Sequence, residues 1–201
     1  MKLLKNQAWK CIPTSMKSHN HKWKRNKWYN VDGKLKLCSN GFHASKTILD
    51  AWTYVNPGFI CIVEFKGDIV TDTDKFCSQK MRIVKRYKWS KKDSLHFSIF
   101  CVKRSMKYFD RKKFPEVWKV CLRSIKVIDA VLLKDTKKNR DAARSAAWSA
   151  ESAAWSARSA AWSAWSAVRS AAWSARSAEK KLQEQWLQKY IKQKWYNDKN
   201  Y

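Results

Sequence analysis

The sequence predicts an α+β fold: a small, mostly antiparallel N-terminal sheet with helices, followed by a long Ala/Ser-rich C-terminal α-helix. Short β-branched and aromatic runs separated by turn residues fill the first part of the chain, which is typical of strands. Apolar residues then recur every three or four positions, which indicates helices. The expected divisions are residues 1–90 for an α+β domain, 91–140 for a helical segment packed on it, and 141–201 for a repeat helix with an amphipathic tail.

The strands are expected within residues 7–89. The segment KWYNVDGKLKLC has the form of a hairpin, with Asp32-Gly33 as its two-residue turn. Ser45 is suited to cap a short helix over KTILDAWTYV. The run FICIVEF is apolar on both faces and is predicted to be a central strand, which Gly67 ends. The segment KMRIVKRYKW alternates more weakly and is expected to form a further strand.

Two helices are predicted after Ser90. Ser90 and Asp93 resemble a capping arrangement at the start of the first helix. Pro115 suits the first turn of the second helix, whose apolar stripe continues to about Leu133. The polar segment KDTKKNR then separates this helix from the repeat.

A Ser/Ala/Trp/Arg repeat begins at about Asp141, and its ideal unit is the heptad SAAWSAR. Because neither Gly nor Pro interrupts it, the repeat is predicted to be helical. On a helical wheel it has an Ala face, a Ser face and a ridge of Trp and Arg side chains that can stack on one another. The ridge carries the tryptophans Trp148, Trp155, Trp162, Trp165 and Trp173. Three interpretations are open: an exposed spacer, a surface for helix association, and direct binding to nucleic acid or membrane.

The tail after the repeat is expected to continue as a helix with a true amphipathic stripe. Its apolar residues are Leu182, Trp186, Leu187, Tyr190 and Ile191. This is the part of the C-terminal helix that is best equipped to dock on another surface.

The formal net charge is +27, from 43 basic and 16 acidic side chains. Residues 142–178 and residues 179–201 each carry +3, which leaves +21 on residues 1–141. Such a chain is attracted to polyanions, and nucleic acid is the first candidate, ahead of anionic membrane. A Lys- and Asn-rich composition is the alternative explanation, since AT-rich genomes encode such chains.

Three basic segments carry the nucleic-acid prediction. Lys and Arg neutralise phosphates, and Trp and Tyr can stack on unpaired bases. The predicted contacts are Lys22, Trp23, Lys24, Arg25 and Lys27, beside Trp28 and Tyr29; then Lys85, Arg86, Lys88 and Trp89; then Lys103, Arg104 and Lys107. The alternative is a solvated charged face with no partner.

The segments LCSNGFHASKTILDAWTYV and FICIVEFKGDIV resemble a domain family of unknown function that is common in tailed-phage and related mobile-element proteins. Its members share a tight turn into C-x-x-G-F-H-A, and they frequently carry Ser/Ala/Trp/Arg repeats behind the domain. The matching motif residues here are Cys38, Gly41, Phe42 and His43. The resemblance implies a viral or mobile-element origin and brings no catalytic residues. Ser45 stands where the family usually has a second cysteine, so a cysteine pair is not expected.

Evidence for catalysis or metal binding in the sequence is weak, so whether the chain is an enzyme is left open, with a non-enzyme expected. A glycine-aromatic-His segment before a helix is also seen in ADP-ribosyltransferase-like folds, which would need Glu64 or Glu116 as the catalytic acid. The alternative is that Phe42 packs and His43 hydrogen-bonds a loop. No cofactor or metal is expected, because the Cys and His spacings fit no standard zinc pattern.

The preferred expectation is a non-enzymatic, phage-type accessory protein that binds nucleic acid or a ribonucleoprotein through its basic surface. The alternative is an assembly protein that forms a homo-oligomer through residues 141–201, and an ADP-ribosyltransferase-like enzyme is third. The sequence predicts no signal peptide, no transmembrane helix and no membrane partner. The expected location is therefore the cytoplasm, which is that of the host cell if the chain is viral.

Overall fold

The computed structural model describes residues 3–18, 21–55, 57–108, 110–146 and 169–197. The chain forms two compact units, which we call the sheet unit (Met1–Ser90 with Lys180–Tyr201) and the helical unit (Lys91–Glu179). The predicted α+β class and the antiparallel sheet are confirmed. The predicted repeat helix falls largely on residues 147–168, which lie outside the described residues.

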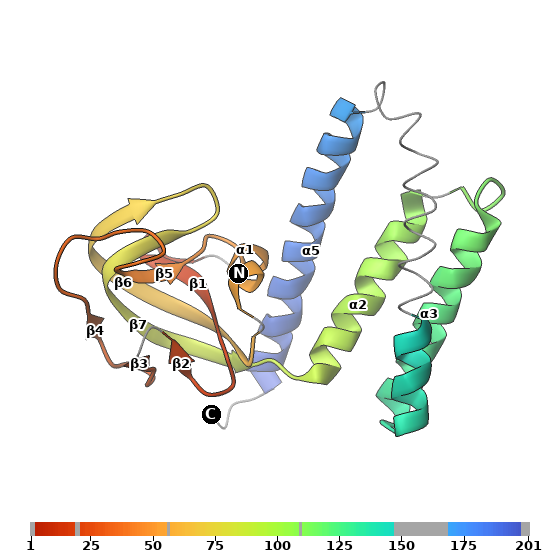
Figure 1. The fold of residues 1–201 in the computed structure, drawn as a ribbon, viewed down its shortest axis with the longest axis horizontal. Helices are drawn as coiled ribbons and strands as arrows, with labels where there is room; N and C mark the ends of the chain where they lie inside the picture. Colours follow the sequence, from red (N-terminus) through yellow and green to blue (C-terminus); the bar gives the residue numbers. More distant parts are fainter. Residues whose placement is uncertain (1–2, 19–20, 56, 109, 147–168, 198–201) are drawn as a thin grey trace. The chain divides into compact units, whose positions relative to one another are not determined.

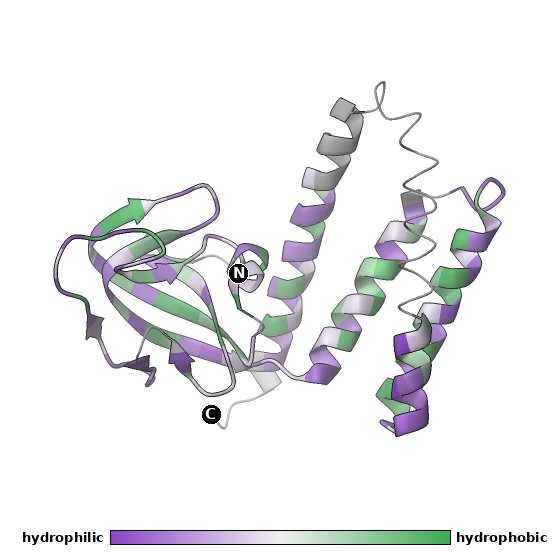
Figure 2. Ribbon diagram, viewed as in Figure 1, coloured by the Kyte–Doolittle hydropathy of each residue, from purple (hydrophilic) through white to green (hydrophobic). Residues whose placement is uncertain are grey.

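The main sheet of the sheet unit is antiparallel throughout (Figure 1). Its strands are β1 (Gln7–Ile12), β6 (Phe59–Thr71), β7 (Phe76–Lys88) and β4 (Tyr29–Asn30), in that order, with β5 (Phe42–Ala44) also paired to β7. A separate small ribbon joins β2 (Lys17–Ser18) to β3 (His21–Lys22). Green and purple residues alternate along the strands in Figure 2, as strands with an apolar and a polar face require.

The sheet curls until its first strand meets the residue after β5. The backbone N–H groups of Trp9 and Ser45 each donate to the other's carbonyl oxygen, over 2.9 and 2.8 Å. Ser45 therefore closes the sheet, whereas the sequence suggested it as a helix cap. The enclosed core consists of Ala8, Ile12, Met16, Trp23, Phe42, Ala44, Cys61, Val63, Phe76, Met81 and Ile83.

Two sequence expectations about turns are wrong. Residues around Asp32-Gly33 form no hairpin, because β4 pairs with β7 rather than with the residues that follow the turn. Gly67 does not end β6 either. Its φ of +78° coincides with a register shift between Lys66 and Ile69, so the strand accommodates a bulge there and continues.

Helix α1 (Ile48–Tyr54) packs beside β1 and is capped by Thr47, whose hydroxyl accepts from the backbone N–H of Asp50 over 3.0 Å. A second cap comes from α5 (Arg169–Asn197). The carboxylate of Glu184 accepts from the backbone N–H groups of Ile48 and Leu49, over 3.0 and 3.1 Å. The C-terminal residues thus return to the sheet unit and complete it.

The tail of α5 docks through its apolar stripe. Leu187 and Ile191 are both fully buried, and the ring of Tyr190 lies 6.2 Å from that of Trp89. Lys180 adds an ion pair with Asp50, over 2.6 Å. The docking expected for the tail from its periodicity is therefore confirmed.

The helical unit contains α2 (Lys91–Ser105), the 3-10 turn η1 (Met106–Tyr108) and α3 (Pro115–Leu133), and residues 137–146 are also helical. Pro115 stands at the start of α3, as expected from its missing N–H. Arg104 forms an ion pair with Glu179 over 3.1 Å. No helix in the described part of the chain is long and apolar enough to cross a bilayer.

Candidate functional site

Two of the aromatic residues predicted to stack on bases are buried. Trp23 is 2% exposed and packs against the rings of Tyr29 and Phe42 in the core. Trp89 is 6% exposed and packs against Trp52. The predicted stacking role is wrong for both, because their large apolar rings are needed in the interior.

The basic residues of the first predicted segment are exposed. Lys22, Lys24, Arg25 and Lys27 all reach solvent in the stretch that leads into β4. The Tyr29 hydroxyl holds this stretch in place, because it donates to the Lys22 carbonyl over 2.7 Å and accepts from the Lys24 backbone N–H over 2.9 Å.

This stretch lies directly against β7, which carries the second basic segment. Asn30 is paired with Lys80 across the strands, and the backbone N–H of Asn26 donates to the Ile83 carbonyl over 2.8 Å. The Arg25 side chain also donates to the carbonyl of Val84, over 3.3 Å. Two basic segments that are far apart in the sequence therefore become neighbours.

The outer face of β6 and β7 extends this basic region. Lys66 is paired with Lys80, and Glu64 with Arg82, so the four side chains share one face of the sheet. Trp28 lies among them, with the Lys66 ammonium and the Arg82 guanidinium each 4.8 Å from its ring. Unlike Trp23, Trp28 is partly exposed.

We call this region the basic–aromatic surface. It consists of Lys22, Lys24, Arg25, Lys27, Trp28, Lys66, Lys80, Arg82 and Lys85. Sequence reasoning missed Lys66, Lys80 and Arg82 because none lies in a dense basic run. The signal that these three residues share is the alternation of side chains between the two faces of β6 and β7. This alternation shows which residues are neighbours only once the register between the two strands is known.

The other predicted nucleic-acid contacts lie elsewhere. Arg86 and Lys88 are exposed further along β7. Lys103, Arg104 and Lys107 belong to the helical unit, where Arg104 is engaged by Glu179. Of the repeat tryptophans, Trp148, Trp155, Trp162 and Trp165 lie outside the described residues, and Trp173 lies in α5. Homo-oligomer formation through the repeat therefore stays a prediction.

The motif around Gly41 builds a tight connection into β5. Gly41 has a φ of +132°, and a Cβ at this position would lie 2.9 Å from the Cβ of Cys77, so only glycine fits without displacement. Phe42 is fully buried in the core. The imidazole Nε2 of His43 accepts from the backbone N–H of Cys38 over 2.9 Å, which ties the preceding loop to β5.

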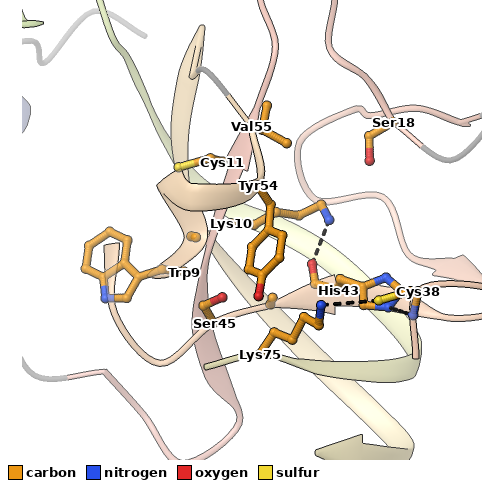
Figure 3. Close-up of a pocket in the computed structure, with 12 residues that line it drawn as sticks. Trp9, Lys10, Cys11, Ser18, Cys38, His43, Ser45, Tyr54, Val55 and Lys75 are labelled. Atoms are coloured by element: carbon orange, nitrogen blue, oxygen red, sulfur yellow. Dashed lines mark hydrogen bonds between the residues drawn. The ribbon is translucent and has the colours of Figure 1, made fainter. Parts of the chain in front are cut away.

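A cavity of about 210 Å³ lies where β1, β5 and α1 meet (Figure 3). Lys10 extends to its edge and donates from Nζ to the carbonyl oxygen of His43 over 2.6 Å. Its side chain is on the core side of β1, in register with Cys61, and only 6% of the residue is exposed. Burial lowers the pKa of Lys10 to about 8, against an ordinary value of 10.5, because the charged form is desolvated.

Lys75 brings a second ammonium group to the same cavity. Its Nζ lies 3.2 Å from the Cys38 sulfur and 4.4 Å from the ring centre of Tyr54. The hydrogen bond to Cys38 raises the pKa of Lys75. Figure 3 shows the Lys10 side chain reaching the His43 carbonyl and the Lys75 side chain reaching the Cys38 sulfur.

The buried thiols nearby are unsuited to nucleophilic chemistry. Burial raises the pKa of Cys11 to about 12 and also raises that of Cys61. Both therefore stay protonated near neutral pH, and a thiol is a far weaker nucleophile than a thiolate. Among the described residues, no group of three or more His, Cys, Asp or Glu side chains is placed to hold a metal ion.

Of the glutamates suggested for an ADP-ribosyltransferase-like site, Glu64 belongs to the same unit as His43 and does not join it. Glu64 is paired with Arg82 on the outer face of the sheet. Glu116 belongs to the helical unit, where it pairs with Lys119 over 2.7 Å. Neither is among the residues that line the cavity beside His43.

The comparisons with known proteins identify a domain but no activity. Residues 6–94 match the model of a family described as a domain of unknown function (DUF7666). A domain of unknown function, as expected from the sequence, is therefore found in the N-terminal part of the chain. No curated protein and no solved structure matches the chain.

Proposed function

We propose that the sheet unit binds single-stranded nucleic acid without sequence specificity through the basic–aromatic surface. The observation that carries this proposal is the pairing of β4 with β7. It joins the stretch from Lys22 to Trp28 to the cationic outer face of β6 and β7. Charge that looks scattered in the sequence thereby comes to lie on neighbouring segments.

The chemistry of the surface suits a flexible polyanion. The surface contains eight cations, and the Glu64 carboxylate on the same face of the sheet is already engaged by Arg82. Phosphate groups would bind the lysines and release counterions, which gives an affinity that falls steeply with salt. An unpaired base could stack on Trp28, while Lys66 or Arg82 moves from the ring to a neighbouring phosphate.

The test is a salt titration with fluorescently labelled oligo(dT), followed by fluorescence anisotropy. The variant Lys66→Gln/Lys80→Gln should bind more weakly, and the slope of log K against log salt should become shallower by about 0.7 for each charge removed. Trp28→Ala should lose about 1–3 kcal/mol of binding free energy, since one stacking platform is removed.

The matched control removes the same charge from the helical unit. Lys137 and Lys138 are both exposed, and Lys137→Gln/Lys138→Gln should leave the slope close to that of the wild type. The proposal is overturned if the wild type does not bind at low salt, or if both double variants lower the slope equally.

We further propose a viral or mobile-element origin and a location in the cytoplasm of the host. The segment from Cys38 to Ala44 and the repeat behind the domain support the origin, through their resemblance to phage-associated proteins. The genes that neighbour the coding sequence provide the check. Capsid, replication or anti-defence genes beside it would agree with this origin, and a purely housekeeping neighbourhood would contradict it.

A further inference from the structure

We propose that the cavity between Lys10 and Lys75 binds a small organic anion, with its carboxylate or phosphate group at the two ammonium groups. The site is separate from the basic–aromatic surface and shares no residue with it. The proposal therefore does not depend on nucleic-acid binding.

Lys10 places a buried ammonium group beside the cavity. Lys10 is about nine-tenths buried, and an ammonium group has three N–H donors. The carbonyl of His43 accepts one of them, the Trp23 ring lies 5.3 Å from the ammonium group, and the described residues give Lys10 no second hydrogen bond. An anionic oxygen in the cavity would accept a further hydrogen bond from Lys10 and offset the cost of desolvation.

The lining of the cavity carries positive charge. Lys10 and Lys75 line it, and no Asp or Glu is found among its described lining residues. Lys75 now contacts the Cys38 sulfur, which is a weak acceptor, and the Tyr54 side chain. An anionic oxygen would be a stronger acceptor for Lys75 than the Cys38 sulfur.

The size and shape of the cavity limit which ligand can enter it. At about 210 Å³, the cavity is smaller than the roughly 300–1,000 Å³ that is usual for drug-sized ligands, so it cannot take a nucleic-acid strand. Ala44, Ala51 and Val55 give it apolar walls, and the Tyr54 ring contributes a flat one. These features suit a compact, partly apolar molecule with one anionic group.

Proton linkage gives the site a recognisable signature. The titratable groups that act on Lys10 are Cys61 and Cys11, and Cys38, His43, Tyr54 and Lys75 line the cavity with it. The nearest carboxylates act one residue further out: Asp74 accepts from the Tyr54 hydroxyl over 2.6 Å, and Glu184 interacts with Cys11. A bound anion would raise the pKa of Lys10 from about 8, so binding above neutral pH would take up a proton. Affinity should therefore fall as the pH rises through this value.

The test is isothermal titration calorimetry of the full chain with benzoate, phenyl phosphate, inorganic phosphate and the neutral analogue benzyl alcohol. At least one organic anion should bind with saturation, and benzyl alcohol should not. Preference for benzoate or phenyl phosphate distinguishes a carboxylate site from a phosphate site. Lys10→Met and Lys75→Met should each weaken binding by about 10- to 100-fold, since each removes a charge-assisted hydrogen bond.

The exposed Lys46 does not line the cavity, and Lys46→Met is the matched control that should bind like the wild type. The variant Lys66→Gln/Lys80→Gln should also keep anion binding, which separates this proposal from nucleic-acid binding. Should Lys10→Met fail to fold, methyl shifts of Ala44, Ala51 and Val55 in the wild type report whether benzoate or phenyl phosphate enters the cavity. Absence of saturable binding, unchanged affinity in Lys75→Met, or methyl shifts located elsewhere would overturn the proposal.

Discussion

Lys10 occupies a position that the pattern of β1 assigns to an apolar residue. Ala8 and Ile12, on the same face of the strand, belong to the enclosed core. Lys10 is held there by the His43 carbonyl and by the Trp23 ring, 5.3 Å from its ammonium group. A cation in this place costs stability, and a cost of this kind is expected where a residue serves a function.

This cost predicts how stability depends on pH. In the unfolded chain Lys10 titrates near 10.5, and in the native state near 8, so the unfolded state binds more protons between these values. Below pH 8 the native state bears the full cost of burying Lys10 in its charged form. Deprotonation of Lys10 removes this cost, so the free energy of unfolding of the wild type should rise by about 3 kcal/mol as the pH rises to 10.5. Urea unfolding of the wild type and of Lys10→Met at pH 7 and at pH 10.5 measures this change.

The variant is also the control in this experiment. Buried thiols such as Cys11 have raised pKa values, so they destabilise the native state above about pH 9 in both proteins. At each pH, the free energy of unfolding of Lys10→Met is subtracted from that of the wild type. The change in this difference between pH 7 and pH 10.5 is the contribution of Lys10. A difference that is the same at both pH values would show that Lys10 is not buried as a cation.

At the scale of elements, the junction between α1 and α5 is the most informative. Helix α1 is short, and its first backbone N–H groups are satisfied by Thr47 and by Glu184 from the far end of the chain. Gln188, one turn further along α5, donates to the same carboxylate over 2.9 Å. The cap therefore fixes which turn of α5 meets α1.

Glu184→Gln should lower the free energy of unfolding by about 1–3 kcal/mol, because a charged acceptor at a helix N-terminus is replaced by a neutral amide. Chemical denaturation followed by far-UV circular dichroism gives the value. The exposed Gln185 lies on the same helix, and Gln185→Ala should change stability by less than about 0.5 kcal/mol. Equal effects of the two changes would contradict the capping role.

At the scale of the whole molecule, the sheet unit is discontinuous in sequence. The chain leaves it after Ser90 and returns at Lys180. The family match, over residues 6–94, covers the sheet but not the returning helix. An excised domain that ends near residue 94 would therefore lack the Glu184 cap and the buried Leu187 and Ile191.

Removal of residues 180–201 should lower the Tm of the sheet unit, because Leu187 and Ile191 no longer cover it. Deletion of residues 152–165, which keeps the period of the repeat, should leave that Tm unchanged. Differential scanning calorimetry measures the Tm of each deletion variant. Sedimentation of the variant that lacks residues 152–165 also tests self-association through the repeat, because this variant keeps the docking helix. A Tm that falls equally in both variants would contradict the assignment of Lys180–Tyr201 to the sheet unit.

Local patterns in the sequence determined the strand at FICIVEF, the start of α3 at Pro115 and the docking stripe of α5. Composition determined the excess of positive charge. These properties depend on residues within a turn or two of one another, so a single sequence carries them. Burial of Trp23 and Trp89, by contrast, depends on neighbours that lie far away in the chain.

Only the tertiary structure decided which segments meet. The closure of the sheet by Trp9 and Ser45 and the placement of Lys66 and Arg82 around Trp28 both follow from register. So does the inward position of Lys10 beside His43. Strand register joins residues that are distant in sequence, and a shift of one residue would turn each of these side chains to the opposite face. No local periodicity encodes that choice, because it is made by the packing of the whole core.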